Sequence, residues 1–406
     1  MLGGSNCQKN AIIQGKASGY EMIIADYSKN PLACEYTDKH VVVSTFDELG
    51  CMRAAEYYKV DGIMTMGTDQ PVLTAAVVAD TLNLPTLISP AQAKSVTNKK
   101  IMKQIFKDEN IPTVKYQLLT EDSSIDDIKG FPGPYVLKPL DSQGQRGVYK
   151  LDSKKLVLKN LNKTLSFSRE KEALLEEYYP SDEITVSGWI QNFKLNILTV
   201  TDRLLRSDPV HIGICVSHRF PSVHMSKYTE IKAISENIVK AFGLINGPLY
   251  IQMLVGEKGI KVNEIAARIG GAFEDVIIPK ISGFNILDAV IRSSLGLDVD
   301  TTVLKEYDCS KSEVSASVQL MFAKPGIISY ITPLEQLLNL DQVLDAGYNY
   351  KLGDSINDIE NATARFGHCV LLNEFDSIIP AVKKFKESFT ILDQEGTNLY
   401  AAFENQ

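Results

Sequence analysis

The first 92 residues alternate between short apolar runs and amphipathic stretches. Apolar residues at helical spacing predict a helix over residues 73–82. The apolar runs have the length and composition of strands and cover residues 22–25, 41–43, 62–65 and 86–88. This alternation is typical of a small doubly wound α/β domain. Residues 1–5 leave little of the usual first strand, so we expect the chain to start late.

The pattern changes near residue 93 and again near residue 306. Between these points, helical spacing predicts helices over residues 94–110, 228–242 and 281–295, the last ending at Gly296. Strand-like runs around a glycine-rich loop predict a small lid over about residues 114–188. We therefore expect three domains, at residues 1–92, 93–305 and 306–406, in an α/β chain without internal repeats.

Two strand-like runs, 249–255 and 260–265, flank the sequence Gly-Glu-Lys-Gly, which is typical of a β-hairpin turn. If Gly259 takes the left-handed position of a three-residue loop, Gln252 lies directly opposite Glu264, with Cβ atoms about 5 Å apart. Alternate strand residues share a face, so Arg268 is expected on the side of Glu264.

A carboxylate opposite an amide suits magnesium, which prefers oxygen ligands and completes its shell with water and phosphates. Arg268 would add a planar fork for an anionic intermediate. The alternative is a surface hairpin with a cross-strand polar pair and a solvated arginine. The pattern of this segment alone leaves both interpretations open.

Lys138 stands on an otherwise apolar strand, where a charged group is costly unless an anion meets it. A nucleotide phosphate would serve. The loop that follows has glycines whose bare backbone amides can approach phosphate oxygens. An ordinary hairpin turn with a lysine that reaches solvent is the alternative. The candidate loop residues are Ser142, Gln143, Gly144, Arg146 and Gly147.

Composition limits the classes of protein that fit. With 406 residues, of which 44% are hydrophobic and 23% charged, the chain can bury a sizeable core in two or three domains. A net charge of −8 argues against a broad nucleic-acid or membrane-surface binder. We expect no membrane span and no signal peptide. The six cysteines lack C-x-x-C spacing, which favours a reducing cytoplasm.

A dinucleotide site in the first domain is a further alternative, because Asp26 follows the early glycines by about twenty residues. The glycine pattern is not G-x-G-x-x-G, however, which argues against nicotinamide binding.

The order of these motifs resembles that of the ATP-grasp superfamily over nearly the whole chain. The resemblance implies an N-terminal doubly wound domain, an ATP-grasp domain with a flexible lid, and a small C-terminal α+β domain. Glu176, Glu177 and Tyr178 resemble the adenine hinge, and Glu183 resembles the acidic residue that binds the ribose. Lys99 and Lys138 resemble the phosphate-binding lysines, and the loop residues named above resemble the family's flexible glycine loop.

The resemblance also implies the metal ligands Gln252 and Glu264, with Arg268, Gly270 and Gly271 as the groups that stabilise the reacting centre. Many members have an acidic residue where this chain has Gln252, and commonly Asn where it has Ala266. Mg²⁺ is therefore implied, with Mn²⁺ as an alternative, and the number of ions stays open.

The run that begins at Arg268 looks like that of carboxylate–amine ligases acting on amino acids, in the L-amino acid ligase and biotin carboxylase-like branch. His218 resembles a substrate-facing residue of this branch. Residues 365–370 resemble its C-terminal domain, for which we expect a packing role. The implied reaction activates a small-molecule carboxylate as an acyl phosphate, forms an amide with an amine, and releases ADP and phosphate.

Two alternatives stay open beside this cytoplasmic ligase. One is another ATP-grasp enzyme, of the purine-biosynthesis, carboxylase or carbamoyl-phosphate-synthase type. The other is a nucleotide-binding protein without catalysis. The resemblance is compatible with a homodimer, and it implies no nucleic-acid or membrane partner.

Overall fold

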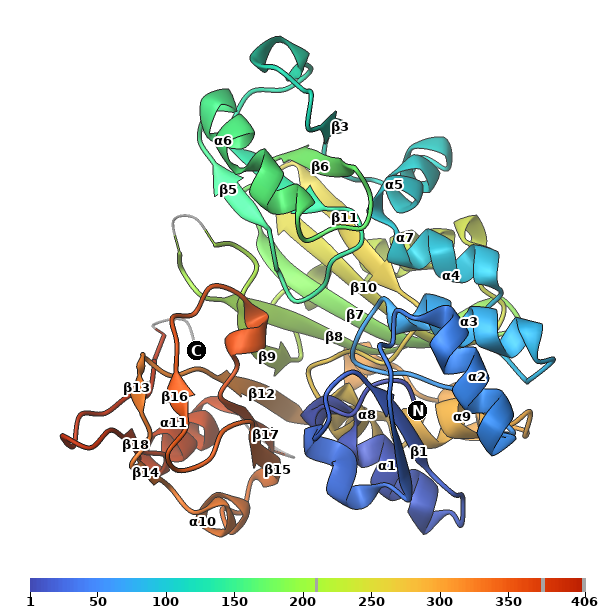
Figure 1. The fold of residues 1–406 in the computed structure, drawn as a ribbon, viewed down its shortest axis with the longest axis vertical. Coiled ribbons are helices and arrows are strands. Elements are labelled where there is room, and N and C mark those ends of the chain that lie inside the picture. Colours follow the sequence, from blue (N-terminus) through green and yellow to red (C-terminus); the bar gives the residue numbers. More distant parts are fainter. Residues whose placement is uncertain (209–210, 374–376, 404–406) are drawn as a thin grey trace.

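The computed structural model describes residues 1–208, 211–373 and 377–403 (Figure 1). A small sheet with its own helix lies at the top of Figure 1, above a long central sheet. The N-terminal residues lie at the lower right and the C-terminal residues at the lower left of the same view. Three parts of the chain therefore surround the central sheet.

The N-terminal part has a parallel pair of strands, β1 (Ile23–Asp26) and β2 (Lys39–Val42), and Leu2 adds an isolated parallel bridge to Ala25. The expected strands at residues 62–65 and 86–88 are not formed. Met64 receives one hydrogen bond from Leu2, too few for a ladder. Thr86 satisfies the backbone of Ile88 with its own hydroxyl, which competes with strand pairing.

Helices α1 (Lys9–Ala17), α2 (Glu48–Tyr58) and α3 (Pro71–Thr81) accompany these strands, and α3 confirms the helix expected at 73–82. The single helix expected at 94–110 is wrong. The chain forms α4 (Pro90–Thr97) and α5 (Lys99–Asp108), separated by Asn98. The Asn98 side chain accepts hydrogen bonds from the amides of Lys100 and Ile101, so it starts a second helix.

The small upper sheet has four strands in the order β3-β6-β4-β5 and carries α6 (Lys154–Leu165). Leu137, Leu175 and Leu161 belong to its separate hydrophobic core. The strands are β3 (Tyr116–Thr120), β4 (Tyr135–Pro139), β5 (Tyr149–Leu151) and β6 (Glu172–Glu177). We call this unit the lid.

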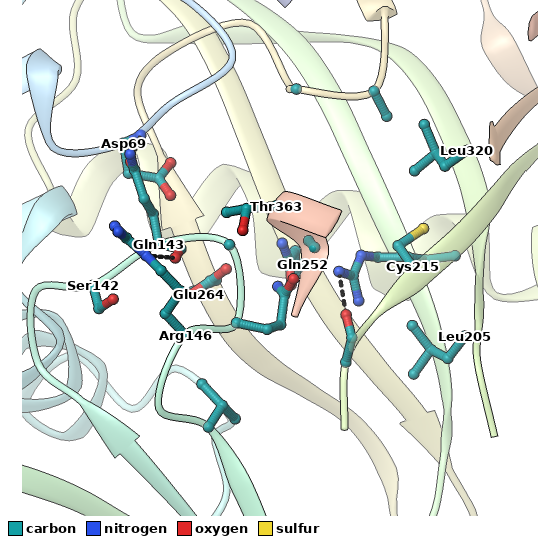
Figure 2. A pocket seen from close by; sticks show the side chains of 18 of the residues that line it. Asp69, Ser142, Gln143, Arg146, Leu205, Cys215, Gln252, Glu264, Leu320 and Thr363 are labelled. Carbon is teal, nitrogen blue, oxygen red and sulfur yellow. Dashed lines mark hydrogen bonds between the residues drawn. The ribbon is translucent and has the colours of Figure 1, made fainter. Parts of the chain in front are cut away.

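The central sheet is antiparallel, with eight strands in the order β11-β10-β7-β8-β9-β12-β17-β15. Hairpin β10–β11 places Gln252 and Glu264 at one cavity, which Figure 2 shows. The strands are β7 (Asp182–Gln191), β8 (Lys194–Leu205), β9 (Cys215–Phe220), β10 (Gly247–Gly256), β11 (Gly259–Ala266), β12 (Ser315–Met321), β15 (Val343–Tyr348) and β17 (Gly367–Asn373). Three strands of the C-terminal region thus extend the sheet that carries the hairpin.

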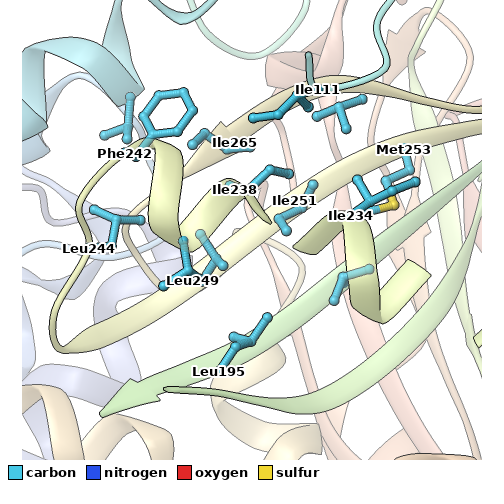
Figure 3. Packing of buried hydrophobic residues seen from close by; sticks show 14 of the residues in the cluster. Ile111, Leu195, Ile234, Ile238, Phe242, Leu244, Leu249, Ile251, Met253 and Ile265 are labelled. Atoms are coloured by element: carbon cyan, nitrogen blue, oxygen red, sulfur yellow. The ribbon is translucent and has the colours of Figure 1, made fainter. Parts of the chain in front are cut away.

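Helix α7 (Tyr228–Ala241) confirms the expected helix at 228–242 and packs Ile234 and Ile238 against Ile251 and Met253 (Figure 3). The helix expected at 281–295 is shorter. Gly283, with a φ of 72°, ends α8 (Glu274–Ser282), and α9 (Ile286–Ser294) follows. The expected end at Gly296 agrees with its φ of 69°.

The remaining C-terminal elements enclose a further apolar cluster that includes Phe366, Phe385 and Phe389. They are β13 (Gly326–Ile327), β14 (Tyr330–Ile331), α10 (Leu334–Leu338), β16 (Ser355–Ile356), α11 (Ile379–Ser388) and β18 (Ile391–Leu392). The division into three domains stays a prediction. Over the described residues, no helix is long and apolar enough to cross a membrane.

Candidate functional site

A cavity of about 940 Å³ lies between the lid, the central sheet and both terminal parts of the chain. This volume is typical of a small-molecule site. Figure 2 shows Asp69, Ser142 and Glu264 on one side, and Leu205 and Leu320 on the other. The cavity thus has a polar compartment beneath the lid loop, and on the other side it presents apolar side chains beside the Arg203–Glu183 ion pair.

The expected register of the hairpin is confirmed, since Gln252 pairs with Glu264. The expected three-residue loop is wrong, because Gly256 already pairs with Gly259. That tight turn alone would set Gln252 opposite Asn263. A β-bulge then shifts the pairing by one residue: Gln252 pairs with Glu264 and Met253 with Val262. Asn263 on β11 is therefore the extra residue. As a result Gln252, Asn263 and Glu264 all line the cavity.

Lys138 projects from lid strand β4 into the cavity, and its Nζ lies 2.5 Å from Oε2 of Glu176 and 2.8 Å from Oδ1 of Asn263. Glu176 also contacts Lys103, at 2.6 Å. Burial alone would raise the pKa of Glu176, but the two lysines lower it to about 2. Glu176 is therefore an ionised carboxylate that holds Lys138, rather than a side chain free to face an adenine ring.

Lys99 is the first residue of α5, and its Nζ lies 3.4 Å from Oε2 of Glu264. It also donates a hydrogen bond of 3.4 Å to the carbonyl of Ser142. Burial opposes the charge of Lys99, yet Glu264 and Asp69 raise its pKa above the usual value. Burial likewise opposes ionisation of Glu264, whose pKa Lys99 and Lys138 hold below its usual value. Both groups are thus charged at neutral pH.

The glycine loop lies over this compartment and contacts both terminal parts of the chain. Gln143 Oε1 accepts a hydrogen bond of 3.0 Å from the amide of Asp69. The carbonyl of Gly144 accepts one of 3.1 Å from the amide of Ala362. The buried hydroxyl of Ser142 has no hydrogen-bond partner within the described ranges, so it offers a donor to a ligand.

Two other predicted loop residues hold the loop's shape. Arg146 donates from Nε to the carbonyl of Gln143, over 3.3 Å, and lines the cavity. Gly147 has a φ of 73°, and a Cβ there would lie 2.7 Å from the ring of Phe167. Only glycine meets both requirements.

Arg268 lies in the cavity wall, as predicted, but its guanidinium is engaged. Nε and Nη2 donate to Oδ1 of Asp69 at 2.8 and 2.5 Å, and the group lies 4.6 Å from the ring centre of Tyr250. Gly271 lines the cavity as well. Gly270 instead packs against Glu274, whose carboxylate a Cβ would overlap at 2.1 Å. Gly270 therefore allows the chain to pass close to Glu274, outside the cavity lining.

The remaining predicted hinge residues line the cavity where the lid meets β7. Glu177 Oε1 accepts a hydrogen bond of 3.1 Å from the amide of Lys115, and Tyr178 stacks under Lys150 at 3.9 Å. Glu183 forms an ion pair with Arg203. The side chains of this segment thus have protein partners that shape the cavity edge.

His218 also lines the cavity, on β9. Its Nδ1 lies 3.4 Å from the hydroxyl of Thr185 and 3.3 Å from that of Thr201. Burial, followed by repulsion from Arg203 and Arg365, lowers the pKa of His218 to about 3. His218 is therefore neutral at physiological pH and offers a hydrogen bond rather than a charge.

Several side chains at the site were not anticipated from the sequence. The sequence pattern could have indicated that Lys103 is buried, because this lysine lies on the apolar face of α5 with Met102 and Phe106. Asn263 was missed because it reaches the cavity only through the bulge. Asp69 lies 199 residues from its partner Arg268, a separation for which local patterns give no signal.

The donor set fits magnesium held together with a phosphate. Glu264 supplies one carboxylate, and Gln252 and Asn263 supply amide oxygens beside two lysines. Magnesium is commonly bound by one or two carboxylates plus substrate phosphates. Within the described residues, no group of three His, Cys, Asp or Glu side chains could hold a metal ion.

Comparisons with known proteins show which sequences and folds this chain resembles. No protein-family model matches the chain. Dapdiamide A synthase of Enterobacter agglomerans is 22% identical over 351 residues, which cover 82% of this chain and 79% of that protein.

Solved structures show the same fold. The L-amino acid ligase of Bacillus licheniformis superposes with a TM-score of 0.80 at 17% identity, covering 97% of this chain and 98% of that one. The biotin carboxylase domain of Hydrogenobacter thermophilus 2-oxoglutarate carboxylase, a dimer in complex with MgADP, ADP and bicarbonate, gives 0.76 at 13% identity, covering 98% and 90%. This chain therefore shares the fold of these ligase and carboxylase structures along nearly its whole length.

Proposed function

We propose that this protein is an ATP-dependent carboxylate–amine ligase that acts on amino acids. One carboxylate is activated by ATP as an acyl phosphate, an amine then forms the amide, and ADP and phosphate leave. The observation that carries the proposal is that Lys99, Lys138, Glu264 and Arg268 line one cavity. They come from the helix before the lid, from the lid, from the hairpin and from the segment just after it. The names of dapdiamide A synthase and L-amino acid ligase support this class of reaction.

The polar compartment has the chemistry that phosphoryl transfer requires. Lys99 and Lys138 would neutralise charge on the phosphates, and the Ser142 hydroxyl and the amides of the glycine loop would donate hydrogen bonds. Glu264 and Gln252 would hold magnesium, with Mn²⁺ as an alternative, and the bound ion would supply further charge neutralisation at the transferred group. Arg268, which Asp69 orients, would stabilise the tetrahedral intermediate that forms when the amine attacks the acyl phosphate. Gly271 lies in the same part of the cavity wall.

The glycine loop would exclude water from the acyl phosphate. Its contacts with Asp69 and Ala362 tie the lid to both terminal parts of the chain. A closed loop therefore covers the reacting centre, which protects a hydrolysable intermediate.

The test is release of ADP and phosphate with magnesium over a panel of amino-acid pairs, each amino acid also assayed alone. A ligase responds to the pair, with an amide product by mass spectrometry. Bicarbonate replaces one partner in a parallel arm, because a carboxylase responds to bicarbonate instead. Release with bicarbonate alone, or no response to any pair, contradicts the proposal.

Two accompanying features are part of the proposal. All six cysteines are free, which suits the reducing cytoplasm in which we place the activity. A homodimer is the proposed assembly, by analogy with the dimer of the Hydrogenobacter thermophilus biotin carboxylase domain, and light scattering checks it.

A further inference from the structure

Arg365 reaches the cavity from the C-terminal region, just before β17. Its Nη1 donates a hydrogen bond of 3.2 Å to the carbonyl of Gly271. Its Nε is buried and has no hydrogen-bond partner among the described residues. A guanidinium has five N–H donors in a rigid fork, so Arg365 retains donors for a ligand.

Two arginines of the cavity wall, Arg268 and Arg203, differ from Arg365 in their charge partners, whereas Arg146 in the lid loop also forms no ion pair among the described residues. Arg268 is paired with Asp69 and Arg203 with Glu183. In the described ranges, Arg365 forms no such ion pair. Glu274 is the carboxylate that acts on it electrostatically, and burial raises the pKa of Glu274. Burial lowers the pKa of Arg365, and Cys215, Cys7 and Glu274 offset this only in part.

The backbone of Arg365 is held in place. Asn349 donates from Nδ2 to the carbonyl of Arg365 at 2.8 Å, and Asn6 donates to Asn349 Oδ1 at 3.3 Å. This chain of amides links the N-terminal part of the molecule to the loop that carries Arg365. A positioned cation costs a ligand less ordering entropy than a flexible one.

The surroundings of Arg365 are mixed, since Glu274, Arg203 and two cysteine thiols act on its charge. Cys215 acts on it electrostatically, and Figure 2 shows Cys215 next to Leu320 and Leu205 on the apolar side of the cavity. Phe273 lines the same cavity and stacks on His368, with ring centres 3.5 Å apart. Arg365 therefore shares the cavity with polar groups and with the apolar side chains that lie next to Cys215.

We propose that Arg365 binds the free carboxylate of the amine-bearing substrate, and that the wall of Leu205, Cys215 and Leu320 accepts the apolar side chain of this amino acid. The inference rests on the proposed function and names its acceptor class. The carboxylate of the acyl donor loses its charge when the amide forms. The acceptor carboxylate stays ionised, so it alone pairs a buried guanidinium throughout the reaction.

The experiment compares L-leucine with L-leucinamide as amine substrates, using the acyl donor that the amino-acid panel identifies. The variants are Arg365→Gln and the conservative Arg365→Lys. KM for the amine substrate, KM for ATP and the thermal midpoint are measured for each. Loss of a charge-assisted hydrogen bond predicts a rise of about ten- to hundredfold in KM for leucine in Arg365→Gln, and a smaller rise in Arg365→Lys.

In contrast, KM for leucinamide and KM for ATP stay within about twofold of the wild type. Leucinamide has no free carboxylate, and ATP binding does not involve the acceptor carboxylate. If Arg365→Gln fails to fold, the leucine-to-leucinamide ratio in Arg365→Lys decides. Three results overturn the inference. They are an equal rise in KM for leucine and leucinamide, a raised KM for the acyl donor, and a wild type that uses polar but not apolar amino acids as amine substrates. A wild type that releases no ADP with any pair overturns the proposed function instead.

Discussion

The ammonium of Lys138 lies 2.5 Å from a carboxylate oxygen of Glu176, whose other oxygen contacts the ammonium of Lys103 at 2.6 Å. Glu176 and Lys103 are almost fully buried, at 2% and 1% exposure, whereas Lys138 is at the cavity surface. One carboxylate therefore serves two cations with different environments. The two cations should respond differently to substitution.

Lys138→Ala should weaken ATP binding and abolish turnover, and the protein should remain folded. The fold tolerates the change because Lys103 still pairs with Glu176. Calorimetry with ATP and circular dichroism measure the two effects. Lys155→Ala, an exposed site on lid helix α6, is the matched control and should bind ATP normally. Unchanged ATP affinity in folded Lys138→Ala would remove Lys138 from the nucleotide site.

Glu176→Gln should destabilise the protein by about 3 kcal/mol, because it leaves the buried Lys103 cation without a charged partner. Glu172→Gln on the same strand is the control, since Glu172 pairs with the more exposed Lys100 and should cost less than about 1 kcal/mol. Urea unfolding of both variants provides the comparison. A similar loss of unfolding free energy in both variants would show that the group of Lys103, Glu176 and Lys138 has no special role in stability.

His218 should make the protein less stable in acid. Its folded pKa of about 3 lies below the unfolded value of 6.5, so its contribution is complete above pH 6.5 and is lost as pH falls toward 3. His218→Asn should therefore flatten the decline of unfolding free energy between these pH values. Chemical denaturation at a series of pH values measures the slope. An unchanged slope in the variant would place the proton uptake elsewhere.

The glycine loop should exchange its amide hydrogens more slowly when nucleotide is bound. Residues 141–147 are held mainly by hydrogen bonds that their carbonyls and the Asp141 carboxylate accept, and phosphates would add acceptors for their amides. Hydrogen–deuterium exchange with and without magnesium and a non-hydrolysable ATP analogue measures this directly, with α7 as the internal reference. Equal exchange in both states would show that the loop is not a nucleotide cover.

Local chemistry made much of the candidate site predictable. A lysine on an apolar strand, glycines after it, and a hairpin with a cross-strand carboxylate each carry a physical signal. The register of Gln252 and Glu264 was predicted correctly, but from a loop length that is wrong, because the bulge compensates for the tighter turn. The position of the pair was thus easier to predict than the backbone that produces it.

Contacts between distant segments could not be predicted in this way. Hydrophobic spacing does not specify that Asp69 meets Arg268, or that Arg365 donates to Gly271. Short strands were also unreliable, since residues 62–65 have the composition of a strand but lack partners to form one. The break at Asn98 shows the same limit, because a capping side chain divided a continuous helical pattern.

Magnesium-dependent ADP formation by Glu264→Gln and Gln252→Glu tests the central proposal most directly. One variant replaces a carboxylate by an amide, and the other replaces the amide opposite it by a carboxylate. Both keep the size of the side chain, so each is a control for the other. Glu264→Gln should lose nearly all activity, because Gln252 and Asn263 beside it supply only neutral amide oxygens. Gln252→Glu should remain active and require no more magnesium than the wild type. Near-normal activity of Glu264→Gln at ordinary magnesium concentrations would contradict the assignment of this hairpin as the metal site.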